Sequence, residues 1–175
     1  MKIVFSAAAG FLLVTAAASA TARPAAARTE SRPAKVEHGA YIYAGRCDSL
    51  EGPVLFDIGD LEAERRPRGN AASTLAGSGP VYEEDEDISA TIEELLASPH
   101  VVVVRERDDR SSPVIACGEI TGEARDGRLS VQLRPVGGSR VGGVAAFGPN
   151  RDRDDHEPTE VLVQVRHGVQ GGAGS

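Results

Sequence analysis

Four consecutive valines, Val101 to Val104, constrain the fold of this chain more than any other feature of its sequence. Valine is branched at Cβ, which makes its side chain stiff and suits it better to a strand than to a helix. A short, uninterrupted apolar run of this kind indicates a strand that is buried on both faces. The rest of the chain must therefore supply apolar material to two sides of one strand.

Further short β-prone runs lie on both sides of the valines, with turn residues between them. Residues 128–134 alternate apolar and polar side chains, which predicts a strand with one solvated face. The Asp126–Gly127 pair just before that run is a hairpin-turn signal. The other predicted strands cover residues 40–44, 53–58, 114–120, 141–147 and 160–166. About seven short strands favour an all-β fold, either an antiparallel β-sandwich or a Greek-key barrel.

One short helix is predicted just before the valines. Ser89 or Thr91 can cap its start, and Glu93 and Glu94 suit the positive end of the helix dipole. Pro99 cannot continue a helix, so it sets the end.

Residues 59–87 contain no clear strand pattern and are expected to form a long loop. That segment ends in the acidic run 83–87, whose carboxylates could bind calcium. The spacing of acidic residues in a calcium-binding loop is absent, which favours a solvated acidic loop instead.

The first residues have the character of an export signal. A basic start at Met1-Lys2 precedes an uncharged stretch from Ile3 to Ala22, which contains two A-x-A cleavage patterns. We predict a signal peptide over residues 1–20, cut after Ala20 or Ala22. A membrane anchor is the alternative, because an uncharged stretch of this length could span a bilayer, but its clearly apolar block is short.

The predicted cleavage divides the chain into simple parts. Residues 21–36 are expected to be a flexible linker, 37–167 a single β-sandwich domain, and 168–175 a flexible glycine-rich tail. No second apolar run follows the signal, so we expect no membrane span in the mature chain and a secreted or periplasmic location. The formal net charge of −7 at pH 7 and the lack of a basic stripe argue against nucleic acid as a partner.

Cys47 and Cys117 are the only cysteines of the chain. In an exported protein such a pair most often forms a disulfide. The alternative is a metal site with two thiolates, which would need histidines nearby. A disulfide would close a loop of about seventy residues and stabilise the fold by roughly 4 kcal/mol in the chain-entropy model.

Three segments around the cysteines resemble the copper/zinc superoxide dismutase family. Residues 41–47 (YIYAGRC) stand where bacterial members have a His-Ile-His strand and a Gly-x-Cys, and residues 103–109 (VVRERDD) follow the pattern of a later valine-rich strand. Residues 114–120 (VIACGEI) are similar to the Ala-Cys-Gly segment whose cysteine pairs with the earlier one. The region also resembles a CHRD-type domain through residues 52–54 and 118–122. Both resemblances imply a β-domain outside the cytoplasm.

The metal ligands that the dismutase resemblance implies are replaced in this chain. Copper in such a site needs converging neutral imidazoles, but the corresponding positions hold Tyr41, Tyr43 and Arg105. An arginine is a fixed cation and would repel copper. The arginine that guides superoxide in the family aligns with Val114.

The histidines of the chain do not obviously rebuild a site. They are scattered along the sequence, and each is expected to face solvent; they are His38, His100, His156 and His167. We therefore predict no catalytic residues, no metal ligands and no cofactor, with Tyr41 and Tyr43 contributing to the core. The predicted function is that of an exported, non-enzymatic β-domain that acts as a binding or structural module. The alternative is a metal-binding or redox protein related to the dismutases.

Overall fold

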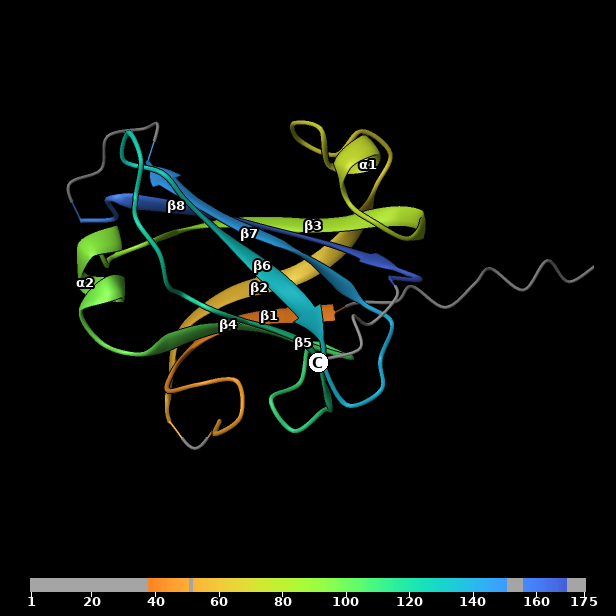
Figure 1. Cartoon of the computed structure of the whole chain (residues 1–175), viewed down its shortest axis with the longest axis horizontal. Helices are drawn as coiled ribbons and strands as arrows, with labels where there is room; N and C mark the ends of the chain where they lie inside the picture. The colour runs from red at the N-terminus through yellow and green to blue at the C-terminus, as the bar shows by residue number, and fades with distance from the viewer. Residues whose placement is uncertain (1–37, 51, 151–155, 170–175) are drawn as a thin grey trace, which may run out of the picture. The chain divides into compact units, whose positions relative to one another are not determined.

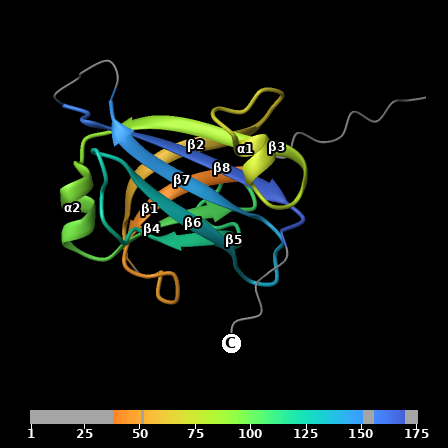
Figure 2. The same ribbon diagram turned by 45° about the horizontal axis from the view of Figure 1, so that its top comes forward.

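The computed structural model describes residues 38–50, 52–150 and 156–169. Within them it contains eight strands and two short helices, which Figures 1 and 2 show wrapped around a common interior. In chain order the elements are β1 (His38–Ala44), β2 (Val54–Glu64), α1 (Ala71–Thr74), β3 (Ser78–Ile88), α2 (Ile92–Ala97), β4 (His100–Arg105), β5 (Val114–Glu119), β6 (Leu129–Pro135), β7 (Gly142–Pro149) and β8 (Thr159–His167).

The predicted signal peptide and linker lie outside the described residues. Of the predicted tail, Gly168 and Val169 are described, and the Val169 amide donates a hydrogen bond to the Arg140 carbonyl oxygen at 3.0 Å. The first residues after β8 are thus held against the loop that precedes β7.

The strands close into a barrel in the order β1-β2-β3-β8-β7-β6-β5-β4, and β4 pairs back onto β1. Every neighbouring pair is antiparallel. The predicted all-β antiparallel class is therefore confirmed, but the sandwich of seven strands is wrong. Strands β4, β1, β2 and β3 lie side by side in that order, which is the order of a Greek key.

Strand β3 is the strand that the predicted set lacks. All of its residues except Ile88 belong to the expected long loop, and the acidic run 83–87 lies within the strand rather than in a loop. Acidic residues have low β propensity, yet β3 pairs with β8 along its length, from Ser78 opposite His167 to Ile88 opposite Thr159. Long-range pairing overrides the local preference here and completes the barrel.

The valine strand is buried on both faces, as predicted. All four valines of β4 are fully buried, and they alternate between two apolar clusters. Val102 and Val104 pack in the main core, which includes buried residues from each of the eight strands. Val101 and Val103 pack in a second, smaller core, which we call the outer core; its buried members are Tyr41, Tyr43, Val101, Val103 and Cys117.

The predicted short helix is α2, which lies at one end of the barrel between β3 and β4 (Figure 1). The Thr91 side chain accepts from the Glu94 amide at 3.2 Å, while the Glu94 carboxylate accepts from the Thr91 amide at 2.8 Å. This reciprocal capping box satisfies two backbone donors at the start of the helix. Ile92 and Leu95 are buried in the main core, so the helix covers the end of the barrel. Helix α1 is not among the predicted elements.

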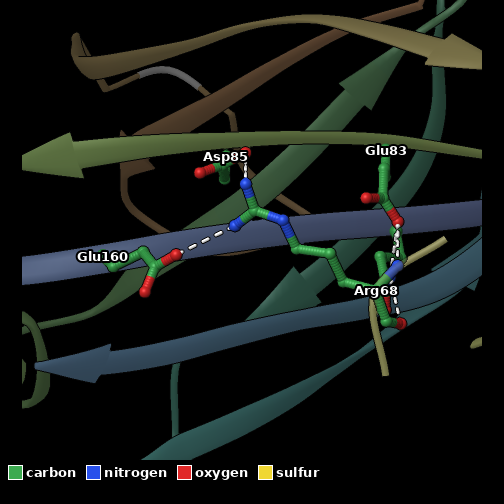
Figure 3. A network of polar contacts seen from close by, with 5 residues as sticks. Arg68, Glu83, Asp85 and Glu160 are labelled. Carbon is green, nitrogen blue, oxygen red and sulfur yellow. Dashed lines mark hydrogen bonds and ion pairs between the residues drawn. The ribbon is translucent and has the colours of Figure 1, made fainter. Parts of the chain in front are cut away.

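A polar network attaches the segment between β2 and β3 to the outer surface of the barrel (Figure 3). The Arg68 guanidinium contacts Asp85 of β3 at 2.7 Å and Glu160 of β8 at 2.9 Å. Its backbone amide donates to the Glu83 carboxylate at 2.9 Å, and the Gln164 side chain donates to the Arg68 carbonyl oxygen at 3.0 Å. Nearby carboxylates raise the pKa of the Arg68 guanidinium against the opposing effect of burial.

Replacing Arg68 with alanine is expected to lower the free energy of unfolding by about 1 kcal/mol, because exposed ion pairs contribute only ~0.2–1 kcal/mol each. The side chain of Arg68 is 43% exposed, so its two ion pairs are partly screened by solvent, and its backbone hydrogen bonds survive the substitution. Urea unfolding at low salt and in 1 M salt measures the effect, which should shrink in salt.

The matched control for that measurement is Arg46→Ala. Arg46 approaches Glu119 at 4.0 Å, with both side chains largely exposed, so its removal should leave stability unchanged. Equal losses in the two variants would contradict a specific role for Arg68.

Candidate functional site

The predicted disulfide is present. Cys47 in the loop after β1 is bonded to Cys117 in β5, with the two Cα atoms 5.9 Å apart. The bridge ties the loop after β1 to the outer face of the barrel. Cys117 itself is almost completely buried.

Tyr41, Tyr43 and Arg105, the positions at which the resemblance implies lost metal ligands, lie on this same outer face. The Tyr43 hydroxyl accepts hydrogen bonds from Arg105 Nη2 at 3.0 Å and Nε at 3.3 Å, and the guanidinium lies 5.5 Å from the centre of the Tyr43 ring. The rings of Tyr41 and Tyr43 are 6.2 Å apart between centroids. This convergence follows from pairing between β1 and β4, which places Tyr41 opposite Val103.

Each of these polar groups is already used within the protein. The Tyr41 hydroxyl donates to the Asp108 carboxylate at 2.6 Å, and Arg105 Nη1 donates to the Ser112 carbonyl oxygen at 2.5 Å. Burial and the hydrogen bond to Asp108 raise the pKa of Tyr41 above its usual value, so the phenol keeps its proton. Both tyrosines are buried in the outer core. We see a structural role for this cluster rather than a place where a ligand enters.

The expectation that every histidine faces solvent is wrong. His38 is only 2% exposed, and its Nε2 lies 3.0 Å from Nε2 of His167. His100 is half-buried, with Nδ1 2.8 Å from the Leu95 carbonyl oxygen. His156 is exposed, as expected. The inward direction of His38 follows from strand alternation with Ala40 and Ile42, but the predicted strand began too late to include it.

The acidic strand carries two carboxyl groups with perturbed ionisation. Burial, followed by repulsion from neighbouring carboxylates, raises the pKa values of Glu84 and Glu86. Glu83 and Asp85 instead contact Arg68. Across residues 38–50, 52–150 and 156–169, no three His, Cys, Asp or Glu side chains are grouped so that they could hold a metal ion.

A shallow groove runs along the junction of β5 and β6. The two strands share only two paired positions, Ala116 with Pro135 and Cys117 with Arg134. A Cβ atom on Gly118 would meet the Gln132 carbonyl oxygen at 2.6 Å, so the strands touch there before they separate. A hollow of about 480 Å³ follows this junction, and two more adjoin it at Thr121, which lines all three. One of about 340 Å³ lies beyond the end of β5, beside residues 45–46 and 96–100, and one of about 490 Å³ lies beside residues 121–130 and β7. We call the three hollows together the β5–β6 groove.

The groove differs in charge from the chain as a whole. Four arginines line it, against two glutamates; these residues are Arg46, Arg125, Arg128 and Arg134, with Glu119 and Glu123. The whole chain has a formal net charge of −7. The disulfide forms part of the wall of the first hollow. Sequence reasoning missed the groove because its arginines come from a loop after β1, a turn and a strand, with no common motif.

Comparisons of the chain with models of known protein families, with curated proteins and with solved structures return no match. The dismutase-like and CHRD-like resemblances therefore remain predictions from short segments. Within the part of the chain that the structure describes, no helix has the length and apolar character needed to cross a membrane.

Proposed function

We propose that this chain is an exported, non-enzymatic β-barrel domain that binds an extended acidic peptide in the β5–β6 groove. The observation that carries the proposal is the gathering of four arginines along one groove of an acidic protein. Export is supported by the signal-like start of the chain and is consistent with the disulfide.

Arginine suits this role because its planar guanidinium can donate two parallel hydrogen bonds to one carboxylate. Arg125, Arg128 and Arg134 are exposed, so a ligand can reach them without prior rearrangement. Elsewhere the net negative charge of the protein repels an acidic ligand, which directs it toward the groove.

A peptide fits the shape of the groove because its first hollow lies between two strands that stop pairing with each other, and the other two hollows extend it. Beyond Cys117 and Arg134 no further ladder pair joins β5 to β6 among the described residues. An extended peptide can add main-chain hydrogen bonds where such strands separate, while its side chains occupy the hollows. The disulfide holds one wall of the groove in place, which reduces the ordering cost of binding.

Fluorescence anisotropy with a labelled peptide of ten glutamates tests this proposal on the full chain. Replacing both Arg128 and Arg134 with glutamine should weaken binding about tenfold, because two exposed charge contacts contribute about 1.4 kcal/mol together. The binding constant of the unchanged protein should also fall when salt is raised.

The control removes the same amount of positive charge outside the groove, by replacing Arg65 and Arg66 with glutamine. Both are exposed and neither lines a hollow of the groove, so binding should be retained. Equal losses in the two double variants, or no binding by the unchanged protein, would refute the site. Equal affinity for an oligogalacturonate of matching charge would instead refute a peptide as the ligand.

A further inference from the structure

His38 and His167 join two strands that are not neighbours in the barrel. His38 is the first residue of β1 and His167 is the last residue of β8, and in the closed order β2 and β3 separate these strands. Their Nε2 atoms nevertheless lie 3.0 Å apart. The ring of Tyr82 from β3 packs against both imidazoles, with 5.2 Å between centroids in each case. The three rings form a contact across the interior of the barrel near one end.

The hydrogen bonds of His38 determine which nitrogen carries the proton. Its Nδ1 lies 2.9 Å from the Glu106 carbonyl oxygen, and a carbonyl can only accept, so Nδ1 carries the hydrogen. In the neutral ring Nε2 of His38 is then an acceptor. Nε2 of His167 is therefore the donor in the contact between the two rings.

The ring positions fit a shared proton better than a shared metal ion. The centroids of the two rings are 5.2 Å apart, and the two Nε2 atoms are 3.0 Å apart. The difference is about the distance from the centre of each ring to its nitrogen, counted once for each ring. The nitrogens thus face each other along the line between the rings. A zinc ion bound to both at about 2.0–2.1 Å would instead hold the two rings at an angle to each other.

Few charged groups are available to stabilise a cation here. Burial lowers the pKa values of both histidines below the usual value, and it is the largest influence on each. The side chain of Arg105 is turned away toward Tyr43, and Glu106 attracts a His38 cation only weakly. The residues beside the pair on the neighbouring elements are Leu61 opposite His38 on β2, Ser78 and Tyr82 on β3, and the backbone of Arg105 and Glu106 at the end of β4.

We propose that the hydrogen bond between His38 and His167 is an acid-released latch that holds the start of β1 to the end of β8. A first proton enters at Nδ1 of His167 and keeps the contact as a charged hydrogen bond, but it places a cation in a desolvated site. A second proton, on Nε2 of His38, leaves both Nε2 atoms as donors, so the bond is lost and the two cations repel each other. The latch is closed at neutral pH and opens under acidic conditions, which an exported protein meets when its surroundings acidify.

The sign of the pH effect follows from the lowered pKa values. The unfolded chain takes up protons on these histidines as the pH falls below about 6.5, while the folded state resists until a lower pH. Stability is complete above about 6.5 and is lost as the pH falls. The unfolding equilibrium constant should rise by up to about tenfold per pH unit for each histidine within that window.

Urea unfolding of the full chain between pH 7.5 and 5 tests the latch, with His167→Gln as the diagnostic variant. Glutamine can still donate to His38 Nε2 but does not titrate, so the pH dependence should fall to about half. His156→Gln removes an exposed histidine and should keep the full dependence. The raised pKa values of Glu84 and Glu86 make stability rise as the pH falls, which opposes the effect of the histidines. This contribution is the same in every variant, so it cancels when their pH dependences are compared.

Two further measurements on the unchanged protein keep the proposal falsifiable. Nitrogen NMR at pH 7.5 should find the hydrogen of His38 on Nδ1, and hydrogen-exchange protection of Gly39 and Arg166 should fall at pH 5 relative to Val102. The latch would be overturned if the protection of Gly39 and Arg166 did not change with pH. It would also be overturned if the stability of His167→Gln depended on pH as strongly as that of the unchanged protein. Stabilisation by added Zn²⁺ that His167→Gln abolishes would also overturn it, because the pair would then be a metal site.

Discussion

Replacing Val103 with aspartate is expected to prevent the chain from folding. Val103 is fully buried, with Tyr41 of β1 opposite it on one side and Cys117 of β5 on the other. A carboxylate there would have no partner in the apolar outer core, and burying an unpaired charge costs several kcal/mol or more. That cost is comparable to the whole stability of a domain, about 5–15 kcal/mol.

Circular dichroism and urea unfolding of the purified variant would measure this effect. The control is Leu55→Asp in β2, because Leu55 is 40% exposed and its carboxylate would remain solvated. We expect the control to retain a cooperative transition near that of the unchanged protein. A soluble Val103→Asp protein with a normal transition would mean that β4 is an edge strand with one open face.

Removing the disulfide is expected to lower the free energy of unfolding by about 4 kcal/mol in the chain-entropy model. Cys47 and Cys117 are separated by 70 residues, so the bridge restricts a large part of the unfolded chain. Alanine is the suitable replacement at both positions, because a serine hydroxyl at the buried Cys117 would need a new partner. Urea unfolding of Cys47→Ala/Cys117→Ala at neutral pH measures the loss.

Mass spectrometry without reductant checks that the unchanged protein, with which the double variant is compared, contains the disulfide. The unchanged protein should be lighter than its reduced form by two hydrogens, with one linked peptide pair that contains both cysteines. Reductant should lower the stability of the unchanged protein to that of the double variant and leave the variant itself unaffected. Two free thiols per chain, or a double variant of undiminished stability, would contradict the expected role.

Several features could be predicted from the sequence because their causes are local or strictly periodic. The double burial of β4 follows from four adjacent apolar side chains that alternate in direction. The start of α2 follows from hydrogen bonds between Thr91 and Glu94 three residues apart. The prediction of the disulfide needed only two cysteines and the expected export to an oxidising compartment. None of these depends on knowing how the strands are ordered.

The closure of the barrel and both candidate sites were decided only by the tertiary structure. An acidic run has no intrinsic preference for a strand. β3 forms because its residues pair with those of β8, and the paired residues Glu83 and Gln164 are about eighty positions apart in the sequence. The same closure brings His38 within hydrogen-bonding distance of His167, 129 residues later. The β5–β6 groove gathers arginines from separate elements. Contacts at such separations leave no periodic trace in the sequence, because they depend on strand order and register rather than on neighbouring residues.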